Sequence, residues 1–174
     1  MRILFIASRF PYPPIRGDQV RAYHFLRLLN LRHEVTLITP GSQHVDLKAQ
    51  EVLAPLSRRW VIIPFHRYEA LLNFLRFPFV SLPLQVLYFC PPSFSKTVRQ
   101  VIEQDNFDII HVQLARMAPI ASGLENVPRV IDFIDALSLN MLRRAKRERR
   151  PLKWLFSMEA RRMARYERDL VLSF

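Results

Sequence analysis

Cysteine and glycine are scarce in this chain of 174 residues. The single cysteine, Cys90, excludes an internal disulfide and fits a reducing, cytoplasmic setting. Three glycines are too few to build a glycine-rich phosphate loop. No run of about 18 apolar residues is present, so we expect no membrane-spanning helix, and the short apolar opening does not resemble a signal peptide.

Motifs for metal binding or serine-hydrolase chemistry are also missing. No His/Cys cluster has the spacing of metal ligands, and no Gly-x-Ser-x-Gly elbow occurs. We therefore predict neither a metal nor a cofactor. The residues that are present are half hydrophobic and 24% charged, which is a globular composition. The length suits one domain with a substantial core.

The net charge of +11 is distributed unevenly. Residues 1–140 carry 15 Lys/Arg against 11 Asp/Glu, whereas residues 141–174 carry 11 against 4. This excess suits an anionic partner such as a phospholipid surface or a pyrophosphate-linked substrate, although a solvated basic helix without a partner explains it as well. We call the following six residues the basic patch: Arg143, Arg144, Lys146, Arg147, Arg149 and Arg150.

Strand and helix patterns alternate along the chain. Apolar runs predict buried strands at 3–7, 34–39, 60–63, 107–112 and 129–134. Helical patterns cover 18–31, 45–56, 68–77, 93–104, 116–122, 138–148 and the residues from 151 onward, with Asp18 as the expected cap of the first. Such repetition predicts an α/β fold with a doubly wound, mostly parallel sheet in three αβα layers.

We divide the chain into two parts. Residues 1–140 are predicted to form a Rossmann-like domain, and residues 141–174 a basic helical segment. In a parallel sheet, ligands bind beyond the carboxyl ends of the strands. Three loops are expected at that edge, namely 9–17, 111–116 and 132–138, so we look there for a binding site.

The first of these loops carries the most chemistry. Its prolines, Pro14 among them, stiffen the chain, and Gly17 lets the backbone approach a ligand closely. Arg9, Arg16 and Arg21 can donate forked hydrogen bonds to phosphate beside a helix N-terminus. A rigid connector with surface arginines is the alternative.

The other two loops supply polar groups. His111 can bind a sugar hydroxyl or a phosphate, or it can be hydrogen-bonded within the structure. Asp132 lies in an apolar stretch and needs a partner such as an arginine. Asp135 can contact an acceptor hydroxyl or act as a general base, or it can cap the next helix together with Ser138.

Glu159 and Glu167 are separated by seven residues. Some sugar transferases use this spacing for sugar-nucleotide binding. Both glutamates lie in an arginine-rich helix here, so ion pairing along the helix explains them better.

Residues 65–92 combine aromatic and aliphatic side chains with scattered arginines. A membrane-facing or lipid-acceptor surface has this composition. The same composition is expected of a core segment that also contacts a partner domain, and we favour that interpretation.

Several motifs resemble the family-4 retaining glycosyltransferases of the GT-B fold. They are Arg2-Ile3-Leu4-Phe5-Ile6, Pro13-Pro14, Gly17, Arg21, His33-Glu34-Val35-Thr36-Leu37, Phe107-Asp108-Ile109-Ile110-His111 and Arg129-Val130-Ile131-Asp132. The stretch 132–138, with Glu159 and Tyr166-Glu167, is similar to sugar transferases associated with exopolysaccharide and exosortase systems.

The resemblance implies the acceptor-side half of an enzyme with two Rossmann-like domains. Its partners would be a nucleotide sugar and a glycan or lipid-linked acceptor, and the loop with Gly17 would approach the donor phosphates. The family often has a histidine where this chain has Ile134, so the catalytic residues stay unassigned. We expect a donor-binding domain beyond Phe174, and without it an inactive chain. The single cysteine, together with the basic patch near residues 65–92, leads us to expect a cytoplasmic protein, peripheral at the inner membrane face.

Two other functions fit the same residues. A non-catalytic module can bind an anionic membrane or a partner protein through the basic patch. Nucleic-acid binding through residues 143–150 lacks an aromatic-interleaved motif, so we predict no nucleic-acid partner.

Overall fold

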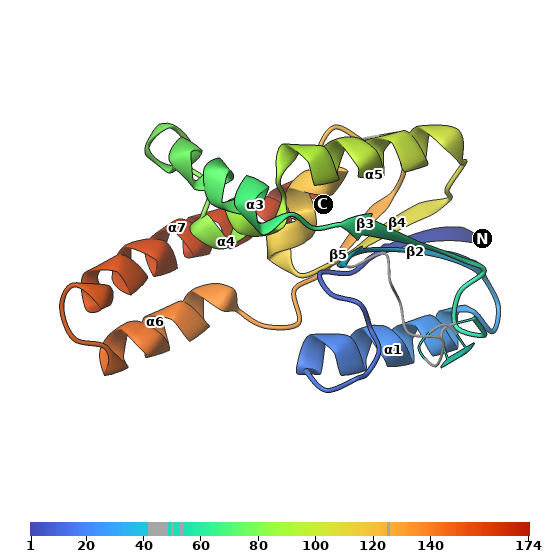
Figure 1. Ribbon diagram of the computed structural model, residues 1–174, viewed down its shortest axis with the longest axis horizontal. Coiled ribbons are helices and arrows are strands. Elements are labelled where there is room, and N and C mark those ends of the chain that lie inside the picture. Colours follow the sequence, from blue (N-terminus) through green and yellow to red (C-terminus); the bar gives the residue numbers. More distant parts are fainter. Residues whose placement is uncertain (42–48, 50, 53, 125) are drawn as a thin grey trace.

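A five-stranded parallel sheet forms the centre of the molecule (Figure 1). The computed structural model describes residues 1–41, 49, 51–52, 54–124 and 126–174. The strands are β1 (Arg2–Ile6), β2 (Glu34–Gly41), β3 (Arg59–Pro64), β4 (Ile109–Gln113) and β5 (Arg129–Asp132). They lie in the order β3-β2-β1-β4-β5. The predicted α/β, doubly wound fold is confirmed.

Helices follow or separate the strands. The α-helices are α1 (Gly17–Leu29), α3 (Arg67–Asn73), α4 (Leu84–Phe89), α5 (Pro92–Gln104), α6 (Leu137–Arg147) and α7 (Leu152–Ser173). Two 3-10 segments are η1 (Phe74–Phe79) and η2 (Ala115–Ala121). In Figure 1, α1 covers one face of the sheet and α5 the other, which gives the three predicted layers.

Alternation along β1 builds a core on each face of the sheet, because successive strand side chains point in opposite directions. The core under α1 contains Ile3, Phe5, Val35, Leu37, Ala22 and Leu26. The core under α5 contains Leu4, Ile6, Ile38, Ile110, Phe94 and Val98. Continuous apolar strand sequences are thus buried on both sides, as parallel sheets require.

The strand order reverses between β1 and β4. From β1 the chain proceeds outward through β2 to β3, and it then returns to the other side of β1 for β4 and β5. Open parallel sheets bind ligands in the crevice beyond the carboxyl ends at such a switch point. The fold therefore directs attention to the residues that follow β1 and β4.

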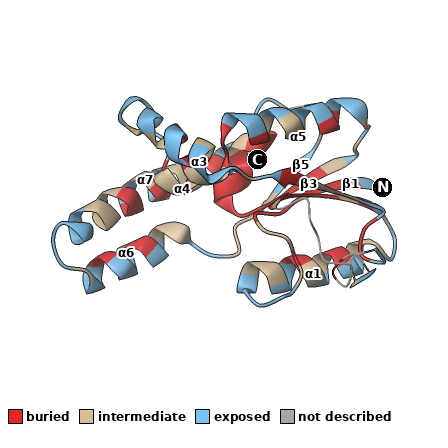
Figure 2. Cartoon of the chain, viewed as in Figure 1, coloured by how far each residue is buried: buried red, intermediate tan, exposed pale blue. Residues whose placement is uncertain are grey.

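The helices α6 and α7 form a hairpin that extends away from the sheet (Figure 1). The end of α7 returns to the body, where Leu170 is buried against Ala115 and Ala118 of η2. The Arg129 guanidinium also donates to the Ser173 carbonyl at 2.9 Å. Figure 2 shows α6 and the start of α7 exposed along their outer sides and η2 almost wholly buried.

Several predicted boundaries were wrong. The strand predicted at 34–39 continues through Pro40 and Gly41 in β2. These two residues pair with β3 alone, since the last pair of β2 with β1 is at Ile38. The predicted helix 68–77 is divided into α3 and the 3-10 segment η1, which contains Pro78. The sequence did not predict α4. Most of the predicted helix 45–56 lies outside the described residues.

Candidate functional site

The loop after β1 leads into the N-terminus of α1 and is fixed by Gln19. The Gln19 amide donates to the Phe10 carbonyl at 2.8 Å, and its oxygen accepts from the Arg16 backbone N–H at 3.2 Å. Arg16 is the N-cap of α1, so the prediction that Asp18 caps this helix was wrong. Gly17 is exposed, and a Cβ at this position would meet nothing within 4 Å. A ligand can therefore approach this backbone closely.

Asp18 receives hydrogen bonds from three side chains. Its Oδ2 lies 2.5 Å from Arg9 Nη1, 3.3 Å from Ser8 Oγ and 3.4 Å from Arg116 Nη2. The Asp18 side chain is only 10% exposed. Its carboxylate joins the first turn of α1 to the ends of β1 and β4.

Arg116 is the buried member of this group. It lies in η2, shortly after β4, and is 8% exposed. Its Nη2 donates to Ser8 Oγ at 3.0 Å, and the guanidinium carbon lies 4.0 Å from the centre of the Phe89 ring. Among the described residues its Nε has no hydrogen-bond partner. Burial, together with the neighbouring charge of Arg9, lowers the pKa of Arg116 to about 10, so it is charged at neutral pH.

We call Ser8, Arg9, Gly17, Asp18 and Arg116 the rim cluster. It holds two guanidinium groups against a single carboxylate, and the charge of Arg16 also acts on Arg116. The N-terminus of α1 adds its positive dipole end. This excess of positive charge beside exposed backbone at the switch point suits an anion such as phosphate.

A second ion pair extends the rim toward β5. Arg21 Nε lies 2.6 Å from Asp132 Oδ2, which confirms that Asp132 is paired with an arginine. Gln113 is the β4 partner of Asp132 in the sheet, and its amide donates to the Asp18 carbonyl at 3.1 Å. Gln113 therefore connects this pair to the rim cluster.

The backbone is unusual at the same edge. Leu114, directly after β4, has φ of 74°, and Ile134, shortly after β5, has φ of 59°. Left-handed φ values are uncommon outside glycine, and a β-branched residue such as Ile134 adopts them at a cost. The Leu114 and Ile134 N–H groups donate to the Asp132 backbone and carboxylate oxygens at 2.7 and 3.2 Å. Such strain concentrates at functional sites.

His111 lies beneath the rim, within β4, and is 9% exposed. Its ring stacks on Phe5 at 4.6 Å between centroids and lies 5.7 Å from that of Phe25. Its Nδ1 has no hydrogen-bond partner among the described residues. Burial lowers the pKa of His111, although nearby Asp132 opposes the shift.

This burial predicts a pH-dependent stability. Because the folded pKa lies below the ordinary value, the unfolded chain binds a proton more readily, and the free energy of unfolding falls as pH drops below about 6.5. Replacement His111→Phe should remove this part of the loss. Urea unfolding at pH 7.5 and pH 5 would compare the two proteins. Equal losses in both would contradict a buried neutral imidazole.

Other predicted site residues do not join the rim cluster. Pro14 and Asp135 are exposed, and no described side-chain interaction connects either of them to Arg9, Gly17 or His111. Asp135 and Ser138 do not cap α6, because Ala136 is its N-cap and has no side-chain cap. The Ser138 backbone N–H and hydroxyl donate to Glu167 at 3.2 and 2.6 Å instead.

Glu159 and Glu167 act as caps for other helices. Glu159 is 4% exposed, and its Oε2 accepts from the Leu84 N–H at the start of α4, at 2.7 Å. Glu167 does the same for α6 through Ser138. No ion pair along α7 involves either glutamate among the described residues, so the predicted helical pairing was wrong. The seven-residue spacing places each carboxylate against a different helix N-terminus.

Arg116, like Ser8, is a member of the rim cluster that the sequence did not single out. The segment 111–116 was expected at the rim, but nothing in it distinguished Arg116 from a surface arginine. The proximity of Ser8 and Asp18, about a hundred positions away in the chain, becomes apparent only in the fold.

The basic patch lies at the end of α6 and in the turn that follows. All six residues are exposed, and Arg144 pairs with Glu148 at 3.3 Å. Within the described residues, no helix combines the length and apolarity needed to cross a bilayer, and no group of three or more His, Cys, Asp or Glu is placed to hold a metal.

Comparisons of the chain with protein-family models and with curated proteins find no match.

Proposed function

We propose that this chain is the acceptor-side domain of a glycosyltransferase that moves a sugar from a nucleotide sugar to a glycan or lipid-linked acceptor. Exopolysaccharide synthesis is the setting that the motifs favour. The parallel sheet and its switch point support the proposal, because open parallel sheets bind ligands beyond the carboxyl ends of the strands at such a point. The family motifs at residues 2–6 and 132–138 lie in or next to strands β1 and β5 of this sheet.

The rim cluster is the observation that carries the proposal. A nucleotide sugar presents a diphosphate, and its charge must be balanced as the sugar departs. Arg9, from the loop after β1, and Arg116, from η2, converge on one carboxylate and leave positive charge unbalanced. The exposed backbone at Gly17 adds N–H groups at a helix N-terminus, which favours phosphate.

In this proposal the chain acts by positioning and by charge. Arg9, Arg116 and the Gly17 backbone would bind the diphosphate and stabilise it as a leaving group. Arg21 and Asp132 would border the acceptor. The Arg21 guanidinium lies over the Phe25 ring, which in turn lies beside the buried His111. No described residue is assigned to proton transfer.

Binding of inorganic pyrophosphate tests the proposal, since it contains the recognised group without a base or a sugar. We expect the double variant Arg9→Gln/Arg16→Gln to bind pyrophosphate at least about tenfold more weakly than the wild type in isothermal titration. The loss should shrink in high salt.

Two arginines at the other end of α1 provide the matched control. Arg27→Gln/Arg32→Gln removes the same charge from exposed positions, so its affinity should stay within about twofold of the wild type. Equal weakening in both double variants would indicate a general charge effect and would contradict a phosphate site at the rim.

A second candidate function rests on the basic patch. Its six cations are exposed, and among them only Arg144 forms an ion pair in the described residues, with Glu148. This excess of positive charge favours a non-catalytic module that binds an anionic membrane. Sedimentation with vesicles of phosphatidylcholine, with and without phosphatidylserine, tests it. The module would be favoured if binding required phosphatidylserine, persisted in Arg9→Gln/Arg16→Gln and disappeared in Arg143→Gln/Arg147→Gln. The wild-type chain should then also show no affinity for pyrophosphate.

A further inference from the structure

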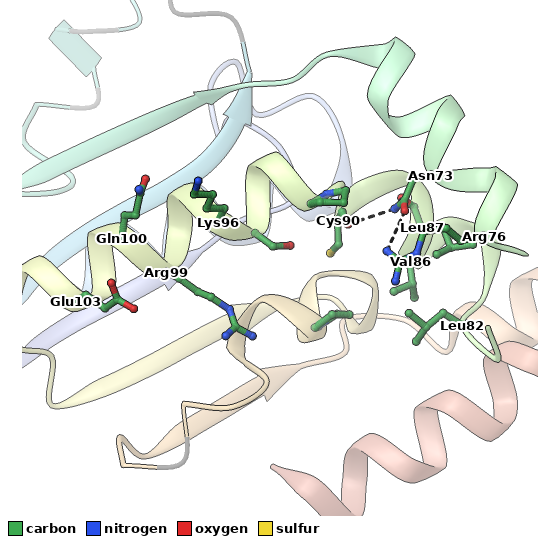
Figure 3. A pocket seen from close by; sticks show the side chains of 13 residues that line it. Asn73, Arg76, Leu82, Val86, Leu87, Cys90, Lys96, Arg99, Gln100 and Glu103 are labelled. Atoms are coloured by element: carbon green, nitrogen blue, oxygen red, sulfur yellow. Dashed lines mark hydrogen bonds between the residues drawn. The ribbon is translucent and has the colours of Figure 1, made fainter. Parts of the chain in front are cut away.

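A cavity of about 620 Å³ lies between α4, α5 and η2, apart from the rim cluster (Figure 3). It is on the face of the sheet that α5 covers, opposite α1. Its size is typical of a small-molecule site. Nothing in the proposed sugar transfer uses it.

The apolar part of the lining comes from α4, from the residues that flank it and from Pro119 of η2. It consists of Leu82, Val86, Leu87, Cys90, Pro92 and Pro119. Val86 and Leu87 are fully or almost fully buried, so this wall is part of the packed body of the protein. Such a wall favours an apolar segment of a ligand over a hydrated ion.

The remaining lining is polar, and its charged members are mostly cationic. They are Arg76, Lys96 and Arg99, against a single acidic residue, Glu103. None of the four forms an ion pair within the described part of the chain. The cavity therefore combines an apolar wall with an excess of positive charge.

Both arginines are held in place by single hydrogen bonds. Arg76 donates to Asn73 Oδ1 at 3.1 Å, and Arg99 donates to the Ser122 carbonyl at 3.1 Å. Asn73 is itself fixed, because its amide donates to the Leu87 carbonyl at 2.7 Å (Figure 3). A guanidinium has five N–H donors, so each arginine keeps several for an anionic ligand.

We propose that this cavity binds an anionic amphiphile, a molecule that joins an apolar segment to a phosphate or carboxylate group. The apolar segment lies against α4, and the anion is bound by Arg99 and Lys96 on α5, with Arg76 on the opposite side. This site is separate from the phosphate site at the rim, so the two proposals can fail independently.

Isothermal titration of the 174-residue chain with dodecyl phosphate, kept below its critical micelle concentration, tests this inference. We expect one molecule to bind per chain. Dodecanol, which lacks the charge, should bind at least about tenfold more weakly, and methyl phosphate, which lacks the chain, should show no saturable binding under the same conditions.

Two kinds of variant localise the binding. Ser95→Trp fills the cavity from α5 and should abolish binding, whereas Thr97→Trp, on the same helix but outside the lining, should not. Lys96→Gln/Arg99→Gln should weaken binding at least about tenfold, whereas Arg27→Gln/Arg32→Gln should leave it unchanged.

Circular dichroism is used first to check that each variant folds. If Ser95→Trp does not fold, the titration of Lys96→Gln/Arg99→Gln alone tests the proposal. Unchanged binding in Lys96→Gln/Arg99→Gln, or equal affinity for dodecanol and dodecyl phosphate, would overturn the proposal. The pyrophosphate result at Arg9 has no bearing on this outcome.

Discussion

Replacement Asp18→Asn is expected to lower the free energy of unfolding by about 3 kcal/mol. The carboxylate is the counter-charge of Arg116, whose side chain is 9% exposed, and it also pairs with Arg9. Asparagine preserves the volume but leaves a buried guanidinium without a compensating charge, and uncompensated buried charge is among the costliest defects in a protein. Chemical unfolding at neutral pH measures the loss.

A double-mutant cycle separates charge from packing. Arg116→Met removes the buried cation, so Asp18→Asn in that background should cost about 1 kcal/mol or less. The exposed pair of Arg58 and Glu34 is the matched control, and Glu34→Gln should change stability by no more than about 0.5 kcal/mol. An undiminished cost of Asp18→Asn in the Arg116→Met background would show that the two side chains are not coupled.

Replacement Phe5→Ala should cost about 4 kcal/mol. Phe5 is completely buried in the core beneath α1 and stacks on His111. Truncation leaves a cavity beneath the helix that supplies Asp18 and Arg21 to the rim, so pyrophosphate affinity should fall together with stability.

An exposed apolar residue provides the control for this change. Ile15 is 78% exposed in the loop before α1, and Ile15→Ala should alter the free energy of unfolding by less than about 0.5 kcal/mol. Urea unfolding measures both variants. A cost below about 1.5 kcal/mol for Phe5→Ala would mean that α1 is not packed over β1 as described.

The sequence predicted the fold well because the signals were local. The apolar runs of β1, β2 and β4, and the helical stripe of Phe94, Val98, Val101 and Ile102, depend only on neighbouring residues and appear directly in the structure. Segments with mixed signals were predicted poorly. Over residues 68–89, which are rich in proline and aromatic side chains, the sequence predicted a helix at α3 but neither the 3-10 segment η1 nor the helix α4. Proline is compatible with turns, 3-10 segments and first helical turns alike, so it does not distinguish them.

The site was predicted in outline only. That Asp132 needed an arginine followed from the cost of burying a carboxylate, and Arg21 supplies it. The roles of Asp18, Glu159 and Glu167 could not be derived in the same way. Asp18 is a normal capping residue by sequence, but the approach of Arg116 from η2 gives it a different task. Long-range pairing decides these roles, and local patterns do not contain it.

The most direct test of the central claim is a map of backbone amide chemical shifts in the 174-residue chain during titration with inorganic pyrophosphate. The account predicts saturable shifts that are largest for the amides of Gly17, Asp18 and Arg9, with smaller changes near Arg116, and their loss in Arg9→Gln/Arg16→Gln. Shifts confined to residues 143–150, with Gly17 unmoved at saturation, would contradict a phosphate site where β1 and β4 end.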